Sequence, residues 1–152
     1  MIIDGGANIG EYSRRAAEFV KGCRIYSFEP VKNTFNRLVK NLKDYESLIP
    51  VNKGLYHENG VKNINLFPSH THSSLYDLQG LSYDPVNTAE IELITGDTFM
   101  EQIGIAYIDL LKLDQEGAEY DALLGFENAL KKAKLKWCNL NSVISISPPR
   151  NC

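Results

Sequence analysis

Short apolar stretches alternate with amphipathic ones along this chain, and no other feature limits its fold as strongly. Residues 1–4 and 23–28 have the apolar and β-branched character of strands. Each precedes a segment in which apolar residues recur every three or four positions. Those segments, residues 12–20 and 31–42, are predicted helices. Further strands and helices are predicted at residues 51–56, 61–67, 91–94, 97–103 (capped by Asp97), 107–113 and 118–124. This alternation predicts an α/β fold with a doubly wound, mostly parallel sheet.

The size and charge of the chain narrow its class further. Its 152 residues suffice for one core, and 43% of them are hydrophobic, which is too many for a disordered chain. No apolar run reaches the roughly 20 residues that cross a bilayer, and the first residues show no signal peptide. A formal charge of −3 argues against a nucleic-acid partner. The three cysteines lack paired spacing, which indicates a reducing compartment, so a cytoplasmic domain is predicted.

In a doubly wound sheet, ligands bind beyond the carboxyl ends of the strands. There the sequence places a glycine-rich turn, Asp4-Gly5-Gly6-Ala7-Asn8-Ile9-Gly10, between the first strand and the first helix. Glycine permits positive φ and lets a ligand come close to the backbone. The turn therefore predicts a ligand site, although a plain strand-to-helix turn would use the same residues.

An acidic residue at the end of the second strand adds to this prediction. Glu29 follows that strand and precedes Pro30, which suits the first turn of the next helix. At this place an acidic side chain can accept both hydroxyl hydrogens of a ribose. A helix start alone also favours an acid, through the helix dipole. Together with the glycine turn, Glu29 indicates a nucleoside ligand.

The spacing within the turn favours one nucleoside over another. A dinucleotide fingerprint is G-x-G-x-x-G, which holds a pyrophosphate at a helix N-terminus. This chain has Gly6-x-x-x-Gly10 without a G-x-G pair, and Asp4 at the head of the turn would repel a pyrophosphate. The same acid can pair with a cationic amino group. S-adenosylmethionine carries such a group together with a ribose and no phosphate, so the residues favour a methyl donor over NAD.

Three stretches of the chain resemble one known family. Residues 4–13 (DGGANIGEYS) and 26–30 (YSFEP) look like the first two motifs of the FkbM-type methyltransferases. Residues 109–119 (DLLKLDQEGAE) are similar to that family's K-x-D-x-E-G-x-E segment. Residues 52–55, 59–60 and 73–75 also fit its pattern, within a resemblance that covers about residues 1–130. It implies a class I, Rossmann-like, S-adenosylmethionine-dependent enzyme of a kind that commonly O-methylates sugars, lipids or polyketides.

The resemblance also implies the positions of the contacts to the cofactor. Asp114 would lie beside the transferable methyl group with Glu116 near it, and these two are the predicted catalytic residues. The implied cofactor-binding residues, from the methionine end through the ribose to the adenine, are Asp4, Gly6, Asn8, Gly10, Asp114, Glu29, Pro30, Gly54 and Leu55.

Simpler roles are open for the charged residues of the late motif. Asp114, Glu116 and Glu119 can be first-turn acids that help to start a helix. Lys112, which alternates with apolar strand positions, can extend from the sheet to solvent.

The histidines do not predict a metal site. His70 and His72 lie two residues apart but have no third ligand at a suitable spacing, so they are interpreted as solvated loop residues. His57 is the remaining histidine. A histidine near the acceptor could act as the general base, because the pKa of its side chain is close to neutrality.

Residues 136–152 fit the predicted fold poorly. The sheet needs another strand after residue 130, whereas this segment is rich in Asn and Ser. Codons for residues 136–141, read two bases further on, can encode Val-Val-Gln-Phe-Glu-Phe, which has the pattern of a buried strand. We interpret residues 1–135 as a partial methyltransferase domain and residues 136–152 as an aberrant, out-of-frame tail. The strand that ends at Leu113 would then be an open edge of the sheet. A genuine divergent tail is the alternative.

The predicted function is O-methylation of a hydroxyl on a small-molecule or glycan acceptor, by a domain truncated at its carboxyl end. Two alternatives are a non-catalytic, nucleoside-binding remnant and an NAD-dependent oxidoreductase. Acceptor selectivity is expected in residues 68–89, which are polar, lack a clear period and are predicted to form a loop.

Overall fold

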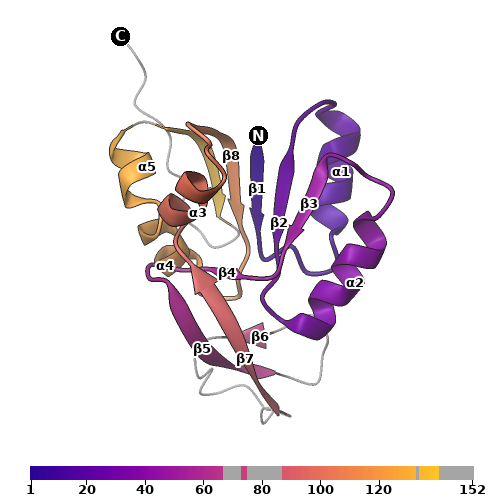
Figure 1. The fold of residues 1–152 in the computed structure, drawn as a ribbon, viewed down its shortest axis with the longest axis vertical. Helices are drawn as coiled ribbons and strands as arrows, with labels where there is room; N and C mark the ends of the chain where they lie inside the picture. The colour runs from indigo at the N-terminus through magenta and orange to yellow at the C-terminus, as the bar shows by residue number, and fades with distance from the viewer. Residues whose placement is uncertain (67–72, 75–86, 133, 141–152) are drawn as a thin grey trace.

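A computed structural model describes residues 1–66, 73–74, 87–132 and 134–140 of the chain (Figure 1). The helices in it are α1 (Glu11–Phe19), α2 (Lys32–Leu42), α3 (Gly96–Gln102), α4 (Glu119–Leu124) and α5 (Glu127–Lys131). The strands are β1 (Ile2–Gly5), β2 (Ile25–Phe28), β3 (Leu48–Val51), β4 (Gly54–Leu55), β5 (Gly60–Leu66), β6 (Ser73–Ser74), β7 (Asn87–Ile94), β8 (Ile108–Leu113) and β9 (Leu135–Leu140). None of the helices in the described residues is long and apolar enough to span a membrane.

The main sheet has the order β3-β2-β1-β8-β9, with all of its strands parallel. From β1, the chain builds outward to β2 and β3 on one side and later to β8 and β9 on the other, so the order reverses between β1 and β8. This arrangement confirms the predicted α/β, doubly wound sheet. The reversal point is where such folds bind ligands.

Helices cover both faces of the main sheet because its strands alternate their side chains between two apolar cores. Ile2 packs with Leu38 and Leu42 of α2, whereas Ile3 packs with Phe99 of α3 and Phe126 beside α5. Figure 1 accordingly shows α1 and α2 on one side of the sheet and α3, α4 and α5 on the other. Strands buried on both faces form near-continuous apolar runs, which is why the sequence indicates them clearly.

A second, accessory sheet with the order β4-β7-β5-β6 lies beyond the carboxyl ends of the main strands (Figure 1). β5 and β7 pair antiparallel, while β4 pairs with β7 in parallel. The sequence predicts strands here but not a separate sheet. It also predicts a loop over residues 68–89, whereas residues 73–74 and 87–89 belong to strands. The polar start of β7 is exposed and therefore lacks an apolar pattern; residues 68–72 and 75–86 lie outside the described part of the chain.

β9 corrects the prediction that the sheet ends at Leu113. Residues 135–140 pair in parallel with β8, from Ile108↔Leu135 to Leu113↔Leu140. Leu135, Cys138 and Leu140 are half-buried against the larger core, and the intervening residues are exposed. This partial alternation suffices for a strand. Residues 141–152 lie outside the described residues, and an out-of-frame origin for the tail stays a prediction that sequencing of the coding DNA would test.

Asp97 stabilises a different helix from the one predicted. The N-cap of α3 is Thr95, whose hydroxyl accepts from the backbone N–H of Thr98 at 3.0 Å. The Asp97 carboxylate instead accepts from the backbone N–H groups of Asn128 and Ala129, at 2.8 and 2.9 Å, in the first turn of α5. Asp97 therefore ties α3 to α5.

Replacing Asp97 by Ala is expected to lower the free energy of unfolding by about 1–2 kcal/mol, because two helix N–H groups lose their acceptor. Urea denaturation measures the change. The matched control is Asp44→Ala, at an exposed position just after α2, which is expected to change stability by less than about 0.5 kcal/mol. Equal stability of the two variants would contradict the role of Asp97.

Candidate functional site

A pocket opens where the carboxyl ends of the main strands meet the accessory sheet. Its walls come from the glycine turn after β1, the segment after β2, the strands β4, β5 and β7 of the accessory sheet, and the loop after β8. The lining residues are Gly6, Asn8, Glu29, Pro30, Val31, Thr34, Gly54, Leu55, Ile64, Ile91, Leu93, Asp114, Gln115, Glu116 and Ala118.

Most residues predicted for the site come together in this pocket. Gly6, Asn8, Glu29, Pro30, Gly54, Leu55, Asp114 and Glu116 all line it. They converge because the carboxyl ends of parallel strands meet at one edge of the sheet. Asp4 and Gly10 do not line it. The residues that the sequence analysis missed are Val31, Thr34, Ile64, Ile91, Leu93, Gln115 and Ala118.

The glycine turn is shaped by close packing within the protein. Gly6 has φ +73°, and a Cβ atom there would lie 1.9 Å from the Asp114 carbonyl oxygen. Gly10 has φ +87°, and a Cβ there would lie 2.8 Å from a Leu38 methyl group. Gly10 therefore allows the turn to pack against α2, which explains why it does not line the pocket. The sequence analysis attributes these glycines to positive φ and to the approach of a ligand. It does not predict that protein atoms pack against them.

Asp4 does not occupy the position predicted for it. Its side chain is 0% exposed, and its carboxylate accepts from the Ser13 hydroxyl at 2.6 Å. Lys112 Nζ lies 3.0 Å from Asp4 Oδ1 and forms an ion pair with it. Burial raises the pKa of Asp4, and Lys112 opposes this effect. Lys112 thus has a buried anionic partner and does not simply extend to solvent.

Glu29 reaches the pocket from the end of β2. Its side chain is almost completely buried, and Oε1 accepts from the backbone N–H of Val31 at 2.9 Å. Burial raises its pKa to about 7, although the backbone N–H groups of Val31 and Asn8 favour the charged form. Near neutral pH, Glu29 is therefore poised between its protonated and ionised forms.

The loop after β8 is held by its own side chains. The Glu119 carboxylate accepts from the backbone N–H groups of Gln115, at 2.7 Å, and Gly117, at 3.1 Å. Gln115 Nε2 donates to the Leu55 carbonyl oxygen at 2.9 Å, which joins this loop to β4 across the pocket. Glu116 has φ +52°, an uncommon backbone conformation for a residue with a side chain. Glu119 thus shapes the loop that presents Asp114 and Glu116.

The two ends of the pocket differ in chemistry. Towards β8 it is acidic and polar, with Asp114, Gln115 and Glu116 on its wall. Towards the accessory sheet it is apolar, because Ile64, Ile91 and Leu93 face it together with Val31 from the start of α2. Its described lining contains the three acids Glu29, Asp114 and Glu116 but no Lys, Arg or His. The pocket therefore favours a cationic ligand with an apolar end.

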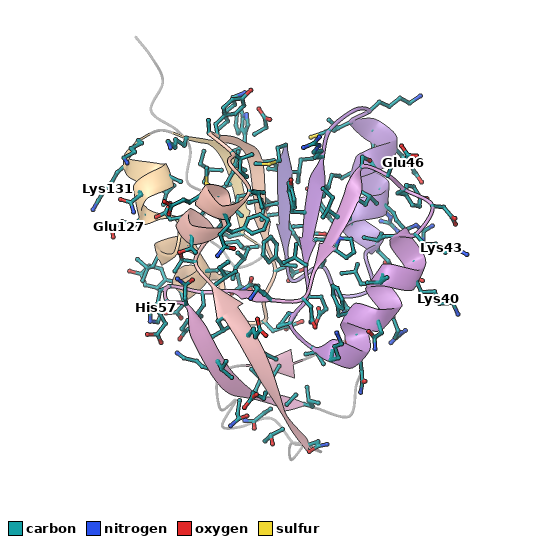
Figure 2. The ribbon with its side chains drawn as sticks, viewed as in Figure 1. Lys40, Lys43, Glu46, His57, Glu127 and Lys131 are labelled. Atoms are coloured by element: carbon teal, nitrogen blue, oxygen red, sulfur yellow. The ribbon has the colours of Figure 1, made fainter. Side chains whose placement is uncertain are left out.

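His57 lies outside this pocket. Its Nδ1 is 2.9 Å from Asp121 Oδ1, and Figure 2 shows it at the outer left of the molecule, near α4. His70 and His72 lie outside the described residues. Within the described part of the chain, no three His, Cys, Asp or Glu side chains are grouped as metal ligands would be.

These features define a domain of the doubly wound α/β class with a pocket at the order reversal of its main sheet. The turn after β1, the acid after β2 and the order reversal between β1 and β8 all meet at one pocket. The FkbM methyltransferase domain matches residues 4–149, nearly the whole chain, so the protein belongs to the FkbM methyltransferase domain family.

Two curated proteins are among its relatives. The hexuronic acid methyltransferase AglP of Haloferax volcanii is 30% identical over 129 residues, which are 84% of this chain and 50% of that protein. The 2-O-methyltransferase NoeI of Sinorhizobium fredii is 24% identical over 88% of this chain and 60% of its own length. This chain thus spans about half of the first relative's length and three fifths of the second's. No solved structure matches the chain.

Proposed function

We propose that this domain binds S-adenosylmethionine and transfers its methyl group to a hydroxyl of a sugar-like acceptor. One observation carries the proposal: a pocket at the order reversal of the sheet has three acids and no base among its described lining residues, and an apolar wall at the opposite end. A dinucleotide such as NAD would bring a pyrophosphate against these acids, so the same observation disfavours an oxidoreductase.

Each part of S-adenosylmethionine has a suitable partner in the pocket. Glu29, once ionised, can accept the two ribose hydroxyl hydrogens. The apolar wall of Ile64, Ile91 and Leu93, together with Gly54 and Leu55, suits the flat face of adenine. Asp114 and Glu116 suit the cationic amino-acid end and the sulfonium. The S-adenosylmethionine would supply the electrophilic methyl group.

The residues of the chain act mainly by position and electrostatics. The polypeptide aligns the acceptor oxygen with the methyl group, and such alignment is a large part of what an enzyme contributes to a displacement reaction. Asp114 and Glu116 place negative charge beside the cationic centre. A carboxylate at this end of the pocket can also take the proton that leaves the acceptor hydroxyl.

The relatives support the choice of acceptor. The names of the two proteins, a hexuronic acid methyltransferase and a 2-O-methyltransferase, describe methyl transfer, in the first case to a sugar acid. We therefore propose a sugar hydroxyl as the acceptor for this domain. Because the chain spans only part of these relatives, a domain that binds the cofactor without turnover is the second candidate.

Calorimetric titration with S-adenosylhomocysteine, the demethylated product, tests cofactor binding. We expect saturable binding of this ligand and none of NAD at the same concentration. Transfer of labelled methyl from S-adenosylmethionine to glucuronic acid or to a glucuronate-containing oligosaccharide then separates an enzyme from a binding domain. Binding of NAD in preference to S-adenosylhomocysteine would overturn the proposal, and binding without transfer to any sugar would favour the second candidate.

A further inference from the structure

Exposed apolar side chains gather at the amino ends of the main strands, opposite the pocket. Because the strands are parallel, their amino ends lie at one edge of the sheet and their carboxyl ends at the other. In Figure 1 the segments that lead into β2, β8 and β9 accordingly lie at the top, and the accessory sheet lies at the bottom. The exposed large hydrophobic residues in these segments are Phe19, Val20, Ile103, Tyr107 and Leu130.

The same segments are rich in basic residues. Residues 19–24, 103–109 and 130–136 contain six basic residues and one acidic residue, although the whole chain has a formal charge of −3. The basic residues are Lys21, Arg24, Lys131, Lys132, Lys134 and Lys136. The acidic residue, Asp109, forms ion pairs with Lys136 and with the terminal ammonium group. We call these three segments the amino-end surface.

Several of these basic groups are available to a partner. Lys132 and Lys134 form no ion pair within the described part of the chain, whereas Lys131 pairs with Glu127. Lys136 Nζ lies 4.9 Å from the centre of the exposed Tyr107 ring, so an aromatic side chain stands among the lysines. The amino-end surface therefore combines accessible cations with exposed apolar groups. It does not extend to the segment before β3, where residues 43–47 hold one basic and two acidic residues.

The composition of this surface favours a lipid bilayer over a protein or a nucleic acid. Interfaces between proteins are enriched in Arg and depleted in Lys, whereas all but one of these bases are Lys. Aromatic rings and lysine side chains both suit the boundary between lipid headgroups and acyl chains. Phe19 is 85% exposed at the end of α1, and a nucleic-acid backbone would offer this side chain no apolar layer.

We propose that the amino-end surface docks on a bilayer that contains anionic phospholipids. Phe19, Val20 and Tyr107 enter the headgroup region, and the lysines contact the anionic headgroups. The pocket, at the opposite end of the main strands, then faces the aqueous phase. This inference concerns a second surface of the domain and does not depend on the proposed function.

Flotation of the full chain with vesicles tests the proposal, because bound protein floats whereas aggregated protein sediments. The vesicles are made of phosphatidylcholine alone or with about one third phosphatidylserine. The wild-type protein is expected to bind the anionic vesicles at least about tenfold more tightly, and this binding should fall steeply between about 0.1 M and about 0.5 M salt. Absence of binding to the anionic vesicles, or equal binding to both kinds, would overturn the proposal.

A double variant locates the basic contacts. Lys132→Gln/Lys134→Gln is expected to weaken binding to the anionic vesicles about tenfold, because each cation near the lipid surface adds to the attraction. The matched control, Arg37→Gln/Lys40→Gln, removes the same charge from exposed positions on α2, where Figure 2 shows Lys40 at the right side of the molecule. The control should stay within about twofold of wild type. Equal losses in the two variants would overturn the assignment to the amino-end surface.

Phe19→Ser tests the apolar contact and is also expected to weaken vesicle binding about tenfold. Its matched control is Tyr120→Ser, which removes an exposed aromatic ring from α4 and should leave binding unchanged. Unchanged binding of Phe19→Ser would contradict insertion of the side chain and overturn the proposal. Circular dichroism confirms that each variant is folded, and the lysine variant tests the surface independently of Phe19.

A second copy of the chain is the rival occupant of this surface. Light scattering after gel filtration measures the mass of the wild-type protein and of Phe19→Ser, and we expect the same mass for both. A wild-type dimer that Phe19→Ser dissociates would make the surface a protein interface and overturn the proposal. Binding of S-adenosylhomocysteine should be the same in all of these variants, because the pocket lies at the other end of the strands. Vesicle binding by a wild-type protein that does not bind this ligand would overturn the proposed function and support the docking surface.

Discussion

Glu29→Gln will make the unliganded protein more stable at pH 8 and will weaken its binding of the cofactor. The two effects have one cause, which is the burial of a carboxylate that must be ionised to accept both ribose hydroxyl hydrogens. Glutamine keeps the size of the side chain and the acceptor for the Val31 N–H, but it carries no charge. Function and stability therefore make opposite demands at this position.

The direction of the pH effect on stability follows from the pKa of Glu29 in the folded and in the unfolded chain. The Glu29 pKa is about 7 in the folded protein and about 4.5 when the side chain is exposed to water. The folded state therefore binds this proton more tightly, and stability falls as the pH rises from about 4.5 to about 7. The full loss, present above pH 7, corresponds to about 3 kcal/mol. The variant lacks this loss because glutamine does not titrate.

Urea unfolding of both proteins at pH 5 and pH 8 measures the effect. The advantage of Glu29→Gln should be largest at pH 8 and should shrink towards pH 5. Burial also raises the pKa of Asp4, which is present in both proteins, so the comparison isolates the titration of Glu29 together with its repulsion by Asp4. A variant less stable than wild type at pH 8 would show that the Glu29 charge is well solvated or well paired.

Cofactor affinity should change with pH in the opposite sense. As the pH falls below 7, protonation of Glu29 removes an acceptor for the ribose. The wild-type affinity for S-adenosylhomocysteine should then fall by up to about tenfold per pH unit. Glu29→Gln should bind weakly, with little dependence on pH between 5.5 and 8. A wild-type affinity that is flat over this range would remove Glu29 from the ribose contact.

Gly6→Ala is expected to destabilise the fold severely, before any effect on ligand binding can be measured. The added Cβ would lie 1.9 Å from the Asp114 carbonyl oxygen, and this neighbour is backbone and cannot rotate away. The positive φ of +73° adds strain for a residue with a side chain. Together these effects are expected to cost about 2–5 kcal/mol of unfolding free energy. Gly6→Val should be worse, so a folded variant that merely lacks binding is not expected.

Gly22→Ala provides the matched control. Gly22 has φ +77°, close to that of Gly6, but no atom lies within 4 Å of the position of its Cβ. This variant isolates the backbone strain, which is about 1–2 kcal/mol. The difference between the two variants in urea unfolding then measures the clash with Asp114. Equal losses would mean that the turn and the loop after β8 can separate without cost.

The sequence predicts the buried parts of this fold well and the partly exposed parts poorly. α2 and β8 are evident because α2 has a clear apolar face and β8 is mostly Ile and Leu. The accessory sheet is missed as a unit because β4 has two residues and the first half of β7 is polar and exposed. β9 is missed because its apolar residues alternate only in part, and Trp137 at its centre is 64% exposed.

The same contrast holds for the candidate site. Residues at the carboxyl ends of strands, such as Glu29 and Asp114, are predicted to meet because the topology of a parallel sheet brings them together. The orientation of Asp4 depends on Lys112, which lies far away in the sequence and becomes its neighbour only through the register of β1 against β8. The apolar wall of Ile64 and Ile91 depends on a sheet whose pairing the sequence does not reveal.

The central position of β1 has a consequence for synthesis on the ribosome. β1 is flanked by β2, which begins at Ile25 directly after α1, and by β8, which begins only at Ile108. The side of the nascent strand that will receive β8 thus stays unpaired until residues 108–113 have emerged. Pairings this distant in sequence form slowly, and exposed strand edges invite pairing with other chains. Chains interrupted before residue 113 are therefore expected to be the species that self-associates during translation.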